Sequence, residues 1–148
     1  MSVSIQEEDF DVASVLDEFK QAHGDSGAVV SFTGLVRTSG EAATIEAMTL
    51  EHYPGMTEKS LAAIEQQARS RWELNEVRII HRIGRLAAGE NIVLVATASA
   101  HRQAAFEAAQ FIMDHLKTEA PFWKKEHTSR GDHWVEGRQS DHDAKSRW

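Results

Sequence analysis

The sequence contains no cysteine, and this absence excludes disulfides, thiolate metal sites and a cysteine nucleophile. Basic residues are also scarce. The chain has 16 lysines and arginines and 23 acidic residues. Its net charge of −7 is opposite in sign to that expected for a general nucleic-acid-binding protein. No apolar run reaches the roughly 18 residues that a membrane-spanning helix needs. Residues 1–8 are acidic and lack the apolar stretch of a secretory signal, so we expect a cytoplasmic protein.

The length of 148 residues fits a single domain over residues 1–148, large enough to bury a substantial core without cross-links. A hydrophobic content of 41% argues against wholesale disorder. The polar composition of the two ends predicts that residues 1–8 and 139–148 are mobile.

Hydrophobic periodicity predicts the secondary structure. Amphipathic helices are predicted at 10–23, 57–72 and 100–118, the last with Ser99 as its N-cap. Strands are predicted at 28–37, 44–53, 77–83 and 92–96 (the last a central strand), a turn at 86–91, and a C-terminal hairpin from 122–127 and 133–137. Because this order is not a regular βαβ alternation, we expect an α+β fold with a mainly antiparallel sheet.

A local reversal of charge is the first functional signal. The basic residues of this cluster are His101, Arg102, His115, Lys117, Lys124 and Lys125, with Arg37 at the end of an earlier strand. In an acidic chain, such a cluster indicates an anionic ligand. His101 and Arg102 fall in the first turn of a predicted helix, where cations oppose the helix dipole but free N–H groups bind phosphate. The alternative is a surface turn that happens to carry Arg102.

Lys117 and Lys124 lie on either side of Pro121, which ends the predicted helix. Their ammonium groups, carried by different elements, are placed to converge on one pocket. Each would neutralise phosphate, and one with a lowered pKa would transfer protons. Two plainer interpretations stay open. Lys117 suits the end of a helix dipole, and Lys124 suits a solvated edge strand.

Eight histidines raise the alternative of a metal site. No HExxH or comparable pair is present, and the weak candidates are His127 and His133, which the predicted hairpin would bring face to face. Phe106 and Met113, at helical spacing, are expected in the core.

Seven blocks of this sequence resemble the large, catalytic subunit of molybdopterin synthase, the MoaE family. They are SFTGLVR (31–37), LEHYPGMT (50–57), HRIG (81–84), SAHR (99–102), AFEA (105–108), MDHLKT (113–118) and APFWKKE (120–126). Their order and spacing fit the family over about residues 27–138.

The resemblance implies an enzyme of molybdenum cofactor biosynthesis with an α/β-hammerhead-like fold. The family converts cyclic pyranopterin monophosphate into molybdopterin by adding two sulfurs as a dithiolene. The sulfur comes from the C-terminal thiocarboxylate of a small ubiquitin-like subunit, so no cofactor and no metal are expected. The family works as a heterotetramer built on a dimer of large subunits.

The resemblance also assigns roles to residues of this chain. It implies that Lys117 and Lys124 are catalytic. The substrate-binding positions are Leu35, Val36, Arg37, His101, Arg102, Lys117, Lys124, Lys125 and Glu126, with Arg138 as a further candidate. His101 and Arg102 would act across the dimer interface. As a mechanistic hypothesis, Lys117 positions the thiocarboxylate and transfers a proton, while Lys124 stabilises charge as the cyclic phosphate opens.

Two rival functions predict different outcomes. A non-catalytic module that binds a ubiquitin-like tail or a phosphorylated metabolite would use the same basic pocket, but lysine substitutions would change affinity only. A metal-dependent hydrolase built on the histidines would bind metal and lose activity with a chelator.

Overall fold

The computed structural model describes residues 2–22, 24–40, 43–135 and 139–148. Its elements, in chain order, are β1 (Val3–Gln6), α1 (Val12–Ala22), β2 (Ala28–Leu35), β3 (Ile45–His52), α2 (Met56–Arg71), β4 (Glu76–Arg82), β5 (Gly84–Ala87), β6 (Asn91–Ser99), α3 (Arg102–Glu119), β7 (Phe122–Thr128), β8 (Gly131–Val135) and α4 (Gln139–Ser146). The strands form two four-stranded sheets, with β1 and β4 as the parallel pair and antiparallel pairing elsewhere. The α+β class predicted from the sequence is confirmed.

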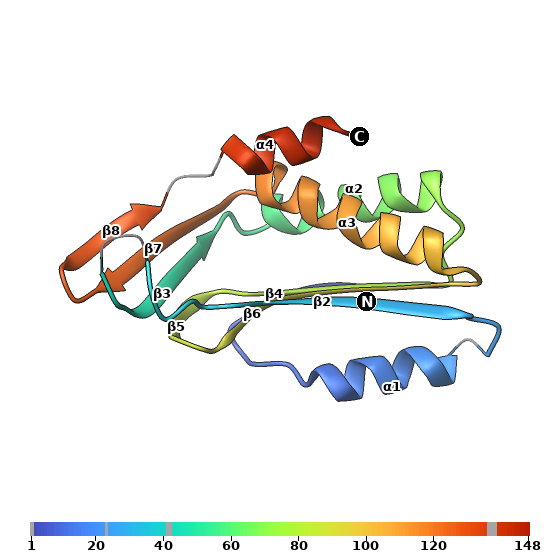
Figure 1. Ribbon diagram of the computed structural model, residues 1–148, viewed down its shortest axis with the longest axis horizontal. Helices are drawn as coiled ribbons and strands as arrows, with labels where there is room; N and C mark the ends of the chain where they lie inside the picture. Colours follow the sequence, from blue (N-terminus) through green and yellow to red (C-terminus); the bar gives the residue numbers. More distant parts are fainter. Residues whose placement is uncertain (1, 23, 41–42, 136–138) are drawn as a thin grey trace.

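The first sheet has the order β1-β4-β6-β2, and β6 lies inside it as predicted. Figure 1 shows α1 on one face of this sheet and α2 and α3 on the other. Alternate residues of β6 therefore enter different cores: Val93 and Val95 pack with the α2 and α3 side, and Leu94 and Ala96 with α1. Burial on both faces explains why 92–96 is apolar without alternation.

The second sheet has the order β5-β3-β7-β8 and lies beside one end of α3 (Figure 1). The chain passes from β4 into β5 at Gly84, whose φ of 87° is readily adopted only by glycine. The sequence predicted a turn over 86–91, and this is wrong in part because Leu86 and Ala87 pair with β3. The turn itself is shorter and contains Gly89, which also has a positive φ.

Three details of α3 differ from the prediction or extend it. The N-cap residue is His101, not Ser99, because Ser99 ends β6 and its hydroxyl donates to the Glu73 carbonyl. Phe106 is 61% exposed, so its expected place in the core is wrong. Met113 does pack against the core. The Phe106 ring therefore lies on the surface of the helix.

Both ends of the chain form elements that the sequence did not predict. β1 pairs in parallel with β4, and Val3 and Ile5 pack on the core. At the other end, Trp148 stacks edge-on against Trp72, and its indole N–H donates to the Asp114 carboxylate at 2.7 Å. These contacts hold α4 against α3 (Figure 1). The mobility of the two ends in solution stays a prediction.

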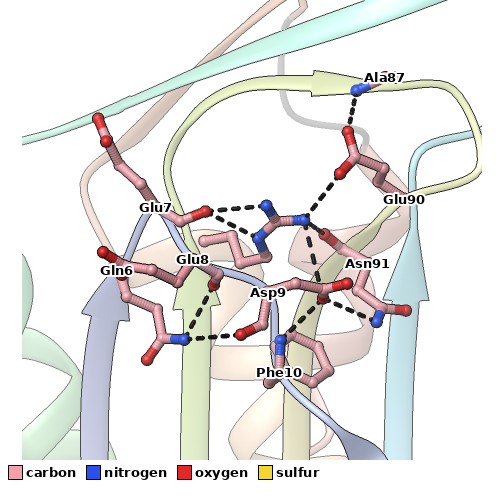
Figure 2. Close-up of polar contacts among 9 residues, drawn as sticks. Gln6, Glu7, Glu8, Asp9, Phe10, Ala87, Glu90 and Asn91 are labelled. Carbon is pink, nitrogen blue, oxygen red and sulfur yellow. Dashed lines mark hydrogen bonds and ion pairs between the residues drawn. The ribbon is translucent and has the colours of Figure 1, made fainter.

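A buried arginine ties the N-terminal segment to the first sheet. The Arg82 guanidinium donates to the carbonyls of Glu7, at 2.8 and 3.1 Å, and of Asn91, at 3.0 Å. Carboxylate oxygens of Glu90 and Asp9 lie 3.4 and 3.8 Å away. Figure 2 shows these groups around one guanidinium, where the β1 end, the β5–β6 turn and the start of β6 meet.

Replacing Arg82 with alanine is expected to lower the free energy of unfolding by about 2–3 kcal/mol, because two carbonyls lose their charged donor. Urea unfolding at fixed protein concentration measures this. Arg85→Ala is the matched control, since Arg85 is exposed on β5, and its effect is expected within about 0.5 kcal/mol. Equal effects of the two substitutions would contradict a stabilising role for the cluster.

Candidate active site

A cavity of about 710 Å³ opens where the two sheets, the C-terminal end of α3 and α4 meet. Its walls come from the ends of β2 and α3 and from the inward side chains of β7. Two residues of α4 and one residue each of β3, β4, β6 and β8 complete them. The polar and charged side chains that line it are Thr33, Arg37, His81, Lys117, Thr118, Lys124, Glu126, Asp141 and His142. Segments far apart in the sequence therefore contribute charge to one space.

Lys117 and Lys124 both line this cavity, as the sequence predicted from their positions on either side of Pro121. α3 ends at Glu119 and the backbone turns extended at Ala120, which aims β7 back past the helix end. The Thr57 hydroxyl of α2 fixes this turn by donating to the Pro121 carbonyl at 3.1 Å. The two ammonium groups are thereby held close together.

The two lysines differ in environment. Lys117 is exposed, whereas Lys124 is largely covered. Burial lowers the pKa of Lys124 to about 8, and the nearby charge of Lys117 acts in the same direction. Asp141 opposes the shift, and Arg37 adds to it. Lys124 is therefore placed to exchange a proton near neutral pH.

The end of β2 brings in the residues that the resemblance assigned to substrate contact. Arg37 and Leu35 both line the cavity, and Leu35 is 54% exposed. Val36 does not, because it is 1% exposed and belongs to the main core. Its backbone is fixed there by hydrogen bonds with Glu90 and Gly89. The side chain of Val36 is therefore part of the core, and its expected contact with substrate stays a prediction.

The remaining expected residues lie on β7, where successive side chains point to opposite faces of the sheet. Lys124 pairs with Val135 and Glu126 with His133, and Lys124, Glu126 and Val135 line the cavity. Lys125 lies between them in the strand and so points to the other face, where its ammonium lies 5.5 Å from the centre of the Trp134 ring. Lys125 therefore does not line the cavity, and its expected contact with substrate stays a prediction. Arg138 lies outside the described residues.

His101 and Arg102 are exposed at the N-terminal end of α3 and do not line the cavity. At about 1.5 Å of rise per residue, Arg102 lies about 22 Å along the helix from Lys117. Within one chain, the two basic groups that the sequence singled out are therefore separate. The structure does not bring His101 and Arg102 to the lysines of the same chain.

Three ionisable side chains of the cavity were not singled out from the sequence. His81 is a buried residue of β4, and Asp141 and His142 lie on α4. The sequence around Asp141 and His142 does not indicate a place in the fold, because a short polar helix has no apolar stripe that would show which side faces the core. His81 did give one: it continues the alternation of Val77 and Ile79, which puts an ionisable ring on the apolar face of a strand.

The hairpin does not form the suggested histidine pair. His127 pairs with Asp132 and His133 with Glu126, so the two histidines point to opposite faces. Each ring contacts a carboxylate instead, at 3.0 Å from Asp132 and 3.1 Å from Glu126. Among the described residues, no three or more His, Asp or Glu side chains lie together as a metal site.

An α+β fold that gathers two lysines and an arginine around one open cavity defines a protein with a site for an anionic ligand. The chain belongs to the MoaE protein family, whose family model matches residues 5–119. In the described part of the chain, no helix combines the length and the apolar character needed to cross a membrane.

Relatives match over most of their length. The molybdopterin synthase catalytic subunit of Escherichia coli K12 is 60% identical, over 84% of this chain and 83% of that protein. The protein of the same name from Pseudomonas aeruginosa is 52% identical over 100% of this chain and 99% of that one. Among solved structures, the MoaE protein of Burkholderia ambifaria superposes with a TM-score of 0.85 at 46% identity, covering 99% and 97% of the two chains. Molybdopterin synthase from Staphylococcus aureus gives 0.81 at 32% identity, covering 89% and 95%.

Proposed function

We propose that this protein is the catalytic subunit of a molybdopterin synthase, a sulfurtransferase acting on cyclic pyranopterin monophosphate. The observation that carries the proposal is the convergence of Lys117 and Lys124 in one cavity of a MoaE-family chain. Relatives with this name match it over most of its length. The proposal places the protein in the cytoplasm and requires no metal or cofactor of its own.

The cavity suits two anionic reactants. The substrate is a phosphate ester, and the sulfur donor is a thiocarboxylate at the end of a small ubiquitin-like subunit. Repulsion between them would oppose binding unless cations lie between them. Arg37, Lys117 and Lys124 supply this charge. The chain has no cysteine to carry transferable sulfur, which agrees with a partner as the sulfur donor.

For each sulfur, the thiocarboxylate sulfur bonds to a carbon of the pterin side chain as the bond between that carbon and its oxygen breaks. The oxygen leaves with the opening cyclic phosphate or as water. Water then attacks the acyl carbon, and the bond between that carbon and sulfur breaks. The small subunit leaves as a carboxylate, and the sulfur stays on the pterin. A group that takes the proton from the attacking water assists this step.

Lys124 is assigned to this proton transfer, and Lys117 to holding the anions. This exchanges the roles in the hypothesis drawn from the sequence. The reason is burial: with a pKa of about 8, Lys124 is about one-tenth neutral at pH 7, and the neutral amine accepts a proton. Lys117, exposed at the cavity, stays available to pair with phosphate or thiocarboxylate.

A second copy of the chain is proposed to supply His101 and Arg102. In a two-fold dimer with antiparallel α3 helices, the N-terminal end of one helix lies beside the C-terminal end of the other. Arg102 of one chain then lies near Lys117 of the other, although the two residues are about 22 Å apart within one chain. Phe106 lies one turn after Arg102 on the same helix face, and its exposed ring offers apolar surface for such a contact.

Reconstituted turnover tests the function. The purified chain, a thiocarboxylated small subunit and cyclic pyranopterin monophosphate are expected to give dithiolene product, followed as its oxidised fluorescent derivative. Lys117→Ala is expected to abolish product while leaving the fold unchanged, because Lys117 is exposed and outside the core. Circular dichroism and melting temperature check the fold.

The rival functions give other results in the same assay. If no product forms although the small subunit binds, the chain is a binding module. If a chelator removes activity, a metal site takes part. Normal turnover by Lys117→Ala would overturn the role of that lysine.

A further inference from the structure

His81 is a buried imidazole at the wall of the cavity. It is 2% exposed, yet it lines the same space as Lys117 and Lys124. Its strand, β4, lies between β1 and β6, so its backbone is held from both sides: it pairs with Ile5 and Val93. The position of the ring is therefore set by the sheet.

The ring orientation is fixed by two further contacts. Its Nδ1–H donates to the Arg82 carbonyl at 2.9 Å. Its face stacks on Phe122 of β7, with ring centres 3.7 Å apart and planes within 15°. Since a carbonyl oxygen only accepts, Nδ1 must carry the proton, and in the neutral ring Nε2 carries a lone pair.

The ring stays neutral in this environment. Burial lowers the pKa of His81 to about 3, and the charges of Lys124 and Lys117 also disfavour its protonation. So weakly basic a group is a poor proton acceptor in catalysis, but it still accepts a hydrogen bond.

The lone pair of Nε2 faces accessible space. Within the described part of the chain, no hydrogen bond to Nε2 is present, and every buried side-chain nitrogen or oxygen there has a partner. Nε2 is therefore not sealed in the core, and the space that His81 borders is the cavity.

Nε2 differs in chemistry from the rest of the site. Arg37, Lys117 and Lys124 are donors that attract anionic oxygens. A neutral imidazole lone pair instead repels an anion and binds an N–H or O–H group. The cavity thus has a cationic part for phosphate and thiocarboxylate, and a neutral acceptor at the His81–Phe122 stack.

We propose that His81 is a substrate-binding residue whose Nε2 accepts a hydrogen bond from an N–H group of the pterin ring system. This contact orients the pterin so that its phosphate-bearing side chain points to Lys117 and Lys124. The inference rests on the proposed function, because it takes the pterin phosphate as the ligand.

Two variants separate the two nitrogens of the ring. His81→Asn keeps an amide N–H near Nδ1 for the Arg82 carbonyl but removes the acceptor at Nε2. His81→Gln reaches the Nε2 position with its amide oxygen and gives up the bond to Arg82. A merely structural role would make stability and binding change together in both variants.

Titration calorimetry with cyclic pyranopterin monophosphate is the measurement, with melting temperature recorded for each variant of the full chain. His81→Asn is expected to weaken binding about tenfold, the effect of one neutral hydrogen bond, with a melting temperature near that of wild type. His81→Gln is expected to bind within about threefold of wild type but to melt at a lower temperature. In turnover, His81→Asn is expected to raise KM for the pterin with little change in kcat or pH profile, and inorganic phosphate is expected to bind all three proteins equally.

Other outcomes overturn the inference. Wild-type affinity in His81→Asn would exclude the contact, and equal weakening in both variants would make His81 structural. If the wild-type chain binds the pterin phosphate but forms no product, the proposed function fails while the binding comparison still decides the role of His81. Absence of wild-type binding would overturn the inference itself.

Discussion

Replacing Lys124 with arginine is expected to lower kcat/KM for sulfur transfer at least about 100-fold, although the positive charge is kept. The reason is that a guanidinium does not release its proton in a protein, whereas Lys124 has a pKa of about 8. In the wild-type protein, the amine must be neutral to accept a proton. The rate is therefore expected to rise with pH and to level off above a pKa of about 8.

The measurement is the pH dependence of kcat/KM for both proteins, with the small subunit saturating. Lys125→Arg is the matched control, expected within about a factor of two of wild type because its side chain points away from the cavity. If Lys124→Arg keeps most of the wild-type activity, or if the wild-type rate falls as pH rises towards 8, Lys124 acts as a cation and not as a base.

The helices and strands could be predicted where their apolar residues follow a clear pattern. α2 and α3 carry an apolar stripe, and β6 is apolar throughout because both of its faces are covered. β1, β5 and α4 escaped prediction because each is short. Their pairing or docking depends on partners distant in the sequence, such as Trp72 for the C-terminal Trp148.

The basic residues of the site could be predicted from the sequence, but the side chains that form the wall of the cavity could not. Lys117 and Lys124 stand out as charges on either side of a helix-ending proline, and the structure places both on one cavity. Lys125 follows a cavity residue in β7, so strand alternation places its side chain on the other face. Val36 comes directly after β2, and no alternation in the sequence showed that its side chain is buried in the core.

Sequence periodicity also cannot show where the apolar face of a strand reaches the wall of a cavity. His81 continues the core face of β4, and only the position of Phe122 and the end of α3 turns it into a cavity residue. The separation of Arg102 from Lys117 follows from the length of one straight helix, and it bears on how many chains form a complete site.

Mixing two inactive variants is expected to restore activity if the site is shared between two chains. Arg102→Ala and Lys117→Ala homodimers are each expected to lose at least about 100-fold in kcat, because each site lacks one anion-binding cation. After subunit exchange at equal amounts, half of the dimers contain one chain of each kind. Each such dimer has one site with both residues intact, so about a quarter of wild-type activity is expected.

Lys117→Ala mixed with Lys124→Arg is the matched control. Both residues line the cavity of the same chain, so no exchange produces an intact site, and the mixture is expected to stay inactive. Differently tagged chains and native mass spectrometry measure the fraction of mixed dimers. Mixed dimers without recovery in the first pair would show that Arg102 does not complete the partner's cavity. Recovery in both pairs would show that the chains do not act through separate cavities. Recovery in the first pair alone would assign the two ends of α3 to one site built from two chains.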